Sequence, residues 1–282
     1  MQAAVSHLTS SIGESILVYD WPPASASAPR AAVLLLHSLS SHSLRHQELV
    51  AYLLRSGFWV RAYDQTGNGA SEGLRGHVMN RQQTLEDASD VIDNWRLEIG
   101  RNLPLLLVGL GSGAVLAADL AQNVRADIAG LVLIAPVFAE RVPSSRRWLQ
   151  RYTPFLYRRL QMAYRIERLL SRTPLVQRAY RSDPLVHHKI TANTAQWLAG
   201  TGAKLLQQAG QWRTPTLLLY AGADAVADTA ATQAFLAAAN AQLLHECYPE
   251  MYHEILHEPG KEQVYARLKG WLTRQFPPAG QA

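Results

Sequence analysis

The sequence has a single cysteine, Cys247, among its 282 residues. One cysteine cannot build a framework of disulfide bonds, which excludes the small disulfide-rich secreted domains and is typical of a reducing compartment. Because Cys247 lies in the strand-like run 243–248, we interpret it as a small core residue.

Long hydrophobic runs are missing as well. No stretch approaches the ~18 continuous apolar residues that span a bilayer. Residues 1–20 lack the charged start and apolar core of a signal peptide. At the same time 48% of the residues are apolar and 17% are charged, which excludes a disordered chain. We therefore expect a soluble, cytoplasmic, globular protein.

The patterns that bind nucleotides or metals are absent too. The two glycines of 64–69 (DQTGNG) are spaced too closely for a phosphate-binding loop, so we expect a tight loop there. His187 and His188 have no second cluster of matching ligands elsewhere, so we interpret them as a surface pair. We predict neither a metal nor a cofactor.

What the sequence does contain is an alternation of short apolar runs and helical patterns. Runs that are apolar throughout are typical of strands buried on both faces. Strands alternating with helices indicate an α/β fold with a mostly parallel sheet covered on both sides. The predicted strands are 15–19, 32–36, 59–63, 105–108, 131–134, 216–220 and 243–247, and the predicted helices are 45–55, 84–99, 113–123, 229–239 and 262–275.

This alternation breaks in the segment 139–198, where arginines and aromatic residues recur at helical spacing and no strand-like run occurs. We predict a helical, arginine-rich insertion that covers the carboxyl ends of the strands, where open α/β sheets bind their ligands. Residues 1–138 and 199–282 would then form one core domain, and the insertion would be its lid.

The basic charge of the protein is concentrated in the same segment. The chain has 27 Lys and Arg against 22 Asp and Glu, but residues 139–190 alone have twelve basic and three acidic side chains. Either this is a solvated helical face, or it is a surface attracted to anionic membrane lipids. In the second case the residues that contact the membrane would be Phe155, Leu156, Tyr157, Met162 and Tyr164. No nucleic-acid-binding module accompanies the charge, so we expect no nucleic acid as partner.

Residues 104–114 (PLLLVGLGSGA) have the pattern of a buried strand, a sharp turn and a helix. This is the context of the nucleophile elbow, G-x-S-x-G, in which flanking glycines leave room for a tightly bent turn. Gly109 and Gly113 fit the two flanking positions, which places Gly111 at the nucleophile position and Ser112 one residue late.

An aspartate and a histidine follow in the order that this elbow requires. Asp224 comes directly after the apolar run that ends near residue 221, and His253 comes after the next one. The order elbow, Asp, His is that of hydrolases with a Ser-Asp-His triad. Either residue alone would be a weak signal, because a loop aspartate or histidine is usually only solvated.

The chain resembles the monoacylglycerol lipase group of the α/β-hydrolases, which is also described as lysophospholipase-like or serine aminopeptidase-like. The resemblance extends from about residue 8 to residue 272. It is carried by Leu36-His37 with His42-Ser43 and Arg45, Tyr63-Asp64-Gln65 with Gly67, Gly69 and Ser71-Glu72-Gly73, Arg75-Gly76, Ser182-Asp183-Pro184-Leu185-Val186, Gly222-Ala223-Asp224 and Tyr252-His253.

The resemblance implies a hydrolase of carboxylic esters with a lipophilic monoacyl substrate. Asp224 would be the triad acid and His253 the base, and the backbone amides of Leu39 and Ser112 would form the oxyanion hole. The sequence departs from the family at two places. The H-G-x-G after the early strand is here 37–40 (HSLS), and the elbow serine is Gly111.

Glycine has no atom that can attack a carbonyl carbon, so an acyl-enzyme cannot form at Gly111. An impaired or unusual hydrolase is one interpretation, and a non-catalytic pseudohydrolase that binds an acyl ligand, a membrane or a protein is another. Ser112 could serve as a displaced nucleophile, although neighbouring side chains in a turn diverge. The pair Asp224–His253 could also act as a general base without a covalent step.

Overall fold

The computed structural model describes residues 2–23, 28–125, 127–141, 159–239 and 243–278. Its main feature is an eight-stranded sheet with the order β1-β2-β4-β3-β5-β6-β9-β10. The first two strands pair antiparallel to their neighbours and the other six run parallel. The strands are β1 (Ala4–Thr9), β2 (Ser15–Trp21), β3 (Ala32–Leu36), β4 (Trp59–Tyr63), β5 (Leu105–Leu110), β6 (Ile128–Ile134), β9 (Thr216–Ala221) and β10 (Leu243–Tyr248).

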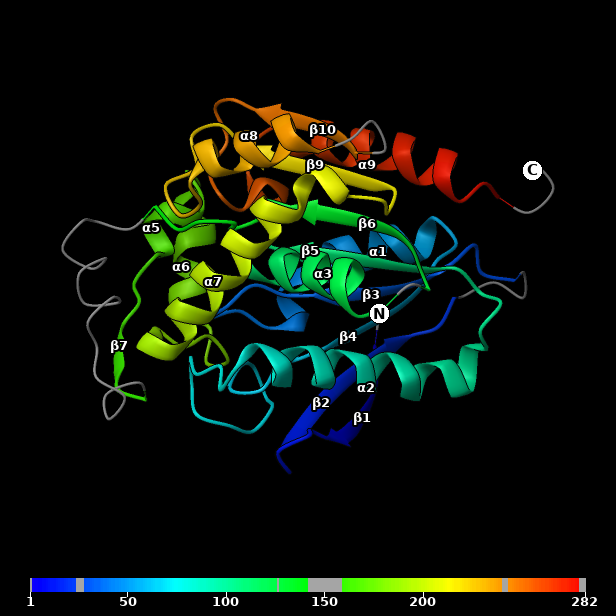
Figure 1. Cartoon of the computed structure of the whole chain (residues 1–282), viewed down its shortest axis with the longest axis horizontal. Helices are drawn as coiled ribbons and strands as arrows, with labels where there is room; N and C mark the ends of the chain where they lie inside the picture. Colours follow the sequence, from blue (N-terminus) through cyan, green and yellow to red (C-terminus); the bar gives the residue numbers. More distant parts are fainter. Residues whose placement is uncertain (1, 24–27, 126, 142–158, 240–242, 279–282) are drawn as a thin grey trace.

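Helices cover both faces of this sheet, as Figure 1 shows. One face packs against α2 (Arg81–Ile99), α3 (Ser112–Asn123), α7 (Ala192–Gln208) and α8 (Thr229–Ala238). The other face packs against α1 (Gln47–Arg55) and α9 (Lys261–Gln275). The sheet therefore has a first core, on the side of α2, α3, α7 and α8, and a second core, on the side of α1 and α9. In β3, residues 32, 34 and 36 belong to the first core and residues 33 and 35 to the second. This is why the strand is apolar throughout, and it confirms the predicted α/β class with a mostly parallel sheet.

All seven predicted strands and all five predicted helices are present, with shifts of a few residues at their ends. The edge strand β1 escaped prediction because almost all of its side chains are exposed, so it carries no apolar signal. Among the described residues, short 3₁₀-helices at Ser43–His46, Ala209–Gln211 and Ile255–His257 join the larger elements.

The inserted segment contains more than helices. Its described part includes α5 (Glu167–Leu170), α6 (Pro174–Ser182) and two three-residue strands, β7 (Gln161–Ala163) and β8 (Lys189–Thr191), which pair antiparallel. No strand was expected here. The following helix α7 runs through residue 198 and packs on α3, so the chain re-enters the core within one helix. Figure 1 shows α5, α6 and α7 gathered at the end of the molecule toward which the parallel strands point.

Within the described residues, no helix combines the length and the apolar character that crossing a bilayer would demand. Cys247 lies on β10, where it is half-buried and packs beside the first core.

Candidate active site

The chain turns sharply where β5 meets α3, and Gly111 is the residue at the bend. Its backbone angles are φ +57° and ψ −119°, a conformation that glycine adopts freely and other residues adopt rarely. A Cβ on Gly113 would lie 2.2 Å from the carbonyl oxygen of Leu36. A Cβ on Gly109 would lie 2.4 Å from the Cα of Ala114. Close packing on both sides therefore requires glycine, and the bend between these two glycines is centred on Gly111.

Asp224 and His253 meet at the carboxyl edge of the sheet. Asp224 follows β9 and His253 follows β10, and their Oδ2 and Nδ1 atoms lie 2.7 Å apart. The second carboxylate oxygen of Asp224 accepts hydrogen bonds from the backbone amides of Val226 and Ala227, each at 2.8 Å. Both side chains are buried. The carboxylate is therefore fixed by the backbone and in turn fixes the imidazole ring.

The Asp224 carboxylate also changes the basicity of His253. Burial alone would lower the pKa of the imidazole, because the protein interior disfavours its charged form. The charge of Asp224 and its hydrogen bond outweigh burial, so the pKa of His253 is raised above its ordinary value of 6.5. This ring is a stronger base than a free histidine.

The other ring nitrogen of His253 faces the bend at Gly111. A Cβ built on Gly111 would lie 3.2 Å from Nε2 of His253. The same Cβ would lie 2.4 Å from the hydroxyl oxygen of Ser38 and 2.9 Å from the Ser38 Cβ. The space that an elbow side chain would fill is thus taken by the side chain of Ser38, on the loop after β3.

The resemblance to the family implied that the backbone amides of Leu39 and Ser112 form the oxyanion hole, and in the structure both amides donate to serine side chains. The Leu39 amide donates to the Ser112 hydroxyl at 2.7 Å. The Ser112 amide donates to the Ser38 hydroxyl over a longer distance of 3.4 Å. The two hydroxyls lie 3.5 Å apart. Both amides therefore already donate hydrogen bonds to serine hydroxyls of the chain itself.

Ser112 is the first residue of α3 and is buried. Its hydroxyl is turned toward Leu39, and Ser112 lines a pocket on the side of Tyr63, Asp87 and Trp197. Ser38, Gly111 and His253 line a different pocket. Within the described residues, the side chain of Ser112 makes its hydrogen bonds with Leu39 and Ser38.

The pocket beside His253 is mostly apolar. Its aliphatic lining comes from the loop after β3, the ends of β5 and β6, the insertion and the loop after β10, namely Leu39, Leu110, Ile134, Ala135, Ile166, Leu170, Ile255 and Leu256. Ser38, Ser41, His46, Tyr180, Glu254 and His257 add polar atoms. Such a lining suits a ligand with a hydrocarbon part and one polar end.

His46 and Glu254 in this pocket were not anticipated from sequence. Neither ring nitrogen of His46 has a hydrogen-bond partner among the described residues, and burial lowers its pKa well below the usual value. For Glu254, burial would raise the pKa, but His257 and Arg45 outweigh it and lower the pKa far below the ordinary range. The pocket thus offers a neutral imidazole beside a fixed carboxylate.

The loop that carries Ser38 is anchored at the end of β4. His37 Nε2 accepts from the Gln65 amide at 2.9 Å, so its Nδ1 donates to the Ser38 carbonyl oxygen at 2.7 Å. Asp64 accepts from the amides of Ser43 and Ala70 at 2.8 and 2.9 Å. The family-like motif 63–65 therefore shapes the loop rather than carrying chemistry itself.

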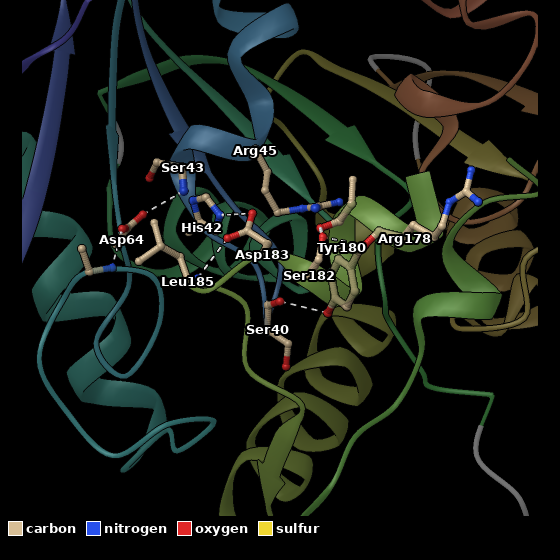
Figure 2. A network of polar contacts seen from close by, with 12 residues as sticks. Ser40, His42, Ser43, Arg45, Asp64, Arg178, Tyr180, Ser182, Asp183 and Leu185 are labelled. Carbon is tan, nitrogen blue, oxygen red and sulfur yellow. Dashed lines mark hydrogen bonds and ion pairs between the residues drawn. The ribbon is translucent and has the colours of Figure 1, made fainter. Parts of the chain in front are cut away.

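The insertion also holds this loop, as Figure 2 shows. His42 Nε2 lies 2.9 Å from Asp183 Oδ2, and the Tyr180 hydroxyl donates to the Ser40 carbonyl oxygen at 2.9 Å. The Arg45 guanidinium lies 4.7 Å above the Tyr180 ring. Ser40 itself has a left-handed φ of +57°, although it is not glycine. These contacts keep the loop in a backbone conformation that serine disfavours.

The insertion is tied to the His253 loop as well. Glu258 accepts from the hydroxyl of Ser171 and the amide of Arg172, at 2.6 and 2.7 Å, and from the Tyr252 amide at 3.1 Å. Its ion pair with the Arg172 guanidinium measures 2.8 Å. One buried carboxylate therefore connects the insertion to Tyr252, the residue before His253.

No group of three or more His, Cys, Asp or Glu that could hold a metal occurs in the part of the chain that the structure describes. The expectation of a surface pair at His187 and His188 is wrong for His187. That ring is buried, with its Nε2 2.8 Å from the side-chain oxygen of Asn68. Burial lowers the pKa of His187 to about 4, so it is a neutral structural residue.

The residues expected to contact a membrane divide into two groups. Phe155, Leu156 and Tyr157 lie outside the described residues. Met162 is half-buried, and Tyr164 is buried with its hydroxyl donating to Glu140 at 3.0 Å. Tyr164 therefore belongs to the packing of the insertion.

Sequence reasoning named Asp224, His253, Gly111, Leu39 and Ser112, and the structure brings all five to one edge of the sheet. It did not assign Ser38 to the site. Two features of the sequence could have indicated this role for Ser38. Residue 38 is serine where the H-G-x-G motif has glycine, and residue 111 is glycine where the elbow has serine.

Comparisons with known proteins agree on a family. Residues 27–260 match the family model described as serine aminopeptidase, S33. The monoacylglycerol lipase of Mycolicibacterium smegmatis is 26% identical over 280 residues, which cover 95% of this chain and 96% of that protein. Human monoglyceride lipase is 25% identical over 284 residues, covering 98% and 92%. An uncharacterized abhydrolase domain-containing protein of Dictyostelium discoideum is 27% identical, but the match spans only 30% of its length.

Solved structures show the same fold. A soluble variant of monoglyceride lipase from Saccharomyces cerevisiae superposes with a TM-score of 0.89 at 17% identity, covering 98% of this chain and 96% of that one. A monoacylglycerol lipase from Paleococcus ferrophilus superposes with a TM-score of 0.77 at 26% identity, covering 98% and 100%. These matches confirm the α/β-hydrolase fold.

Proposed function

Because the chain belongs to the serine aminopeptidase (S33) family of hydrolases, in its monoacylglycerol lipase-like group, we propose that it acts on lipophilic monoacyl esters. In this proposal Asp224 orients His253 and His253 moves the proton. The observation that carries it is the buried Asp224–His253 pair, which opens onto an apolar pocket beside the strand–helix bend.

The proposed reaction differs from that of the parent family at its first step. No acyl-enzyme can form at Gly111, so the standard elbow route is closed. Loss of the nucleophile from a working triad costs on the order of 10⁶ in turnover. We therefore propose that this protein is impaired as a hydrolase compared with relatives that carry serine at the elbow.

Ligand binding tests the proposal independently of turnover. We expect a 1-O-alkylglycerol ether, which cannot be hydrolysed, to bind saturably in titration calorimetry. Ile166 lines the pocket, so Ile166→Trp should weaken binding at least about tenfold. Leu169, three residues on, is more exposed and does not line the pocket, so Leu169→Trp is the matched control. Absence of saturable binding, or equal weakening by both variants, would contradict the proposal.

A second candidate is a non-catalytic acyl-binding protein. It is favoured by the two serine hydroxyls on the amides of Leu39 and Ser112, because those amides would otherwise be free for an oxyanion. Under this candidate the ether binds, and no ester is turned over by any residue of the chain.

We further propose that the insertion contacts an anionic membrane surface. Support comes from Leu175 of α6, which is 67% exposed, and from Arg178 and Arg181, which are exposed on the same helix. Binding should favour phosphatidylglycerol vesicles over phosphatidylcholine vesicles, weaken with salt and weaken further in Arg178→Gln/Arg181→Gln. Vesicle binding that is equally strong at low and high salt, and with both lipids, would contradict this membrane proposal. A cytoplasmic location remains a prediction from sequence.

A further inference from the structure

Ser38 and Gly111 fit each other sterically. The hydroxyl oxygen of Ser38 lies 2.4 Å from the point where a Cβ on Gly111 would stand, so the two side chains could not both be present without a shift. A glycine at the elbow therefore creates the room into which Ser38 projects. The serine at residue 38 and the glycine at residue 111 therefore fit together without a clash.

The imidazole of His253 faces the same space. Its Nε2 lies 3.2 Å from the elbow Cβ position, and its other nitrogen is held by Asp224 at 2.7 Å. Ser38 and His253 also line the same pocket, whereas Ser112 lines the neighbouring one. Of these two serines, Ser38 is the one that shares its pocket with the base.

We propose that the nucleophile has moved from the elbow to the loop after β3, and that Ser38 attacks the ester carbonyl with His253 as its base. This inference rests on the proposed function, since it needs an acyl ester in the pocket. It assigns the role of nucleophile to a residue that lies on a different strand end from the family's elbow.

The reaction balances with groups that the site supplies. The Ser38 oxygen forms a bond to the ester carbonyl carbon, the carbonyl π pair moves onto its oxygen, and the hydroxyl proton passes to Nε2 of His253. When the carbonyl re-forms, the bond to the alcohol breaks, and His253 returns the proton to the leaving alkoxide. Water then attacks the acyl-Ser38 ester in the same order and regenerates the hydroxyl.

Ser112 completes this arrangement as a donor. Because its hydroxyl accepts from the Leu39 amide at 2.7 Å, its own hydrogen is directed away from Leu39 and can be donated. Its backbone amide points at the Ser38 oxygen, at 3.4 Å. An oxyanion formed next to Ser38 would thus meet both an O–H and an N–H of Ser112. Ser112 acts as oxyanion donor and not as nucleophile.

The test is the position of a covalent adduct on the full chain. We expect an alkyl fluorophosphonate to add one equivalent, located at Ser38 by peptide mass spectrometry. Ser38→Ala should lose the adduct and lower the hydrolysis of nitrophenyl esters at least ~10³-fold. The matched control is Ser43→Ala, because the Ser43 hydroxyl has no partner among the described residues and does not line the pocket. It should keep both the adduct and the rate.

A second variant guards against a simple loss of folding. In Ser38→Gly/Gly111→Ser the adduct should reappear at residue 111, with a melting temperature close to that of the parent. An adduct on Ser112, or an unlabelled parent chain that still binds the alkylglycerol ether, would overturn the role of Ser38 and leave the proposed binding function intact. Failure of both labelling and ether binding would overturn the proposed function itself.

Discussion

Ser38 and Gly111 share one small space, and this makes a prediction about restoring the elbow. Gly111→Ser alone places a Cβ 2.4 Å from the Ser38 oxygen, so one of the side chains must be displaced. A catalytic group that is misplaced by about 1 Å can lose about 10² in rate. We expect the double variant Ser38→Gly/Gly111→Ser to hydrolyse nitrophenyl butyrate on the order of 10²-fold faster than Gly111→Ser. Equal initial rates for the two variants would show that Ser38 does not obstruct the elbow.

His253 gives the site a defined dependence on pH. The imidazole must be neutral to accept a proton, and the charge of Asp224 outweighs burial and raises its pKa above 6.5. The value of kcat/KM should therefore rise with pH and reach half its maximum above pH 6.5. In Asp224→Asn burial is opposed only by the weaker charge of Glu254, so the half-maximum should move to lower pH while the plateau falls.

Asp228→Asn is the control for this profile, because the Asp228 carboxylate lies in the same loop but caps α8. Its pH profile should match that of the parent. A parent profile centred at or below pH 6.5 would contradict the assigned role of the Asp224–His253 pair.

The strand–helix unit β5–α3 depends on Gly113. A Cβ there would lie 2.2 Å from the Leu36 carbonyl oxygen and 2.4 Å from that of His37. Gly113→Ala should therefore lower the free energy of unfolding by about 1–3 kcal/mol. Gly200 is also helical but has no atom within 4 Å of its Cβ position, so Gly200→Ala should raise it by about 0.5–1 kcal/mol. Urea unfolding of both variants measures the difference, and effects of the same sign would refute the packing argument.

The insertion and the His253 loop are held together by Glu258. Burial would raise the pKa of this carboxyl, but the hydrogen bonds from Ser171, Arg172 and Tyr252 outweigh burial and lower it below 4.5. The carboxylate thus contributes stability that is present above pH 4.5 and is lost as pH falls through the folded-state pKa. At pH 7, Glu258→Gln should lower the free energy of unfolding by about 1–3 kcal/mol, the range for hydrogen bonds to a charged group.

The deficit of Glu258→Gln should shrink as the pH is lowered below 4. Glu250→Gln, at an exposed residue ahead of His253, should change the unfolding free energy little at either pH. Chemical denaturation at the two pH values provides the measurement. A deficit that is the same at pH 7 and below pH 4 would mean that the charge of Glu258 is not what stabilises this connection.

Over the whole molecule, the sequence predicts best what depends on burial and chain order. The strands are recognisable because their side chains enter two cores, and Asp224 and His253 are recognisable because they follow strand ends. Gly109 and Gly113 reveal the elbow because backbone packing excludes any side chain there.

The features that the sequence does not predict depend on contacts between segments that are distant in sequence. Ser38 enters the site through the conformation of a loop that Gln65 holds at His37 and Tyr180 holds at Ser40. His187 is buried because Asn68 lies beside it. Neither contact leaves a local pattern, which is why periodicity and spacing do not predict them.

At the scale of the whole molecule, we propose that His253 still carries out ester chemistry although the elbow has no side chain. The most direct test is the release of fatty acid from a monoacylglycerol by the parent chain and by His253→Gln, at equal and saturating substrate. We predict measurable turnover in the parent and a rate at least ~10³-fold lower in His253→Gln, with alkylglycerol ether binding unchanged within about twofold. Equal rates in the two proteins would contradict the account.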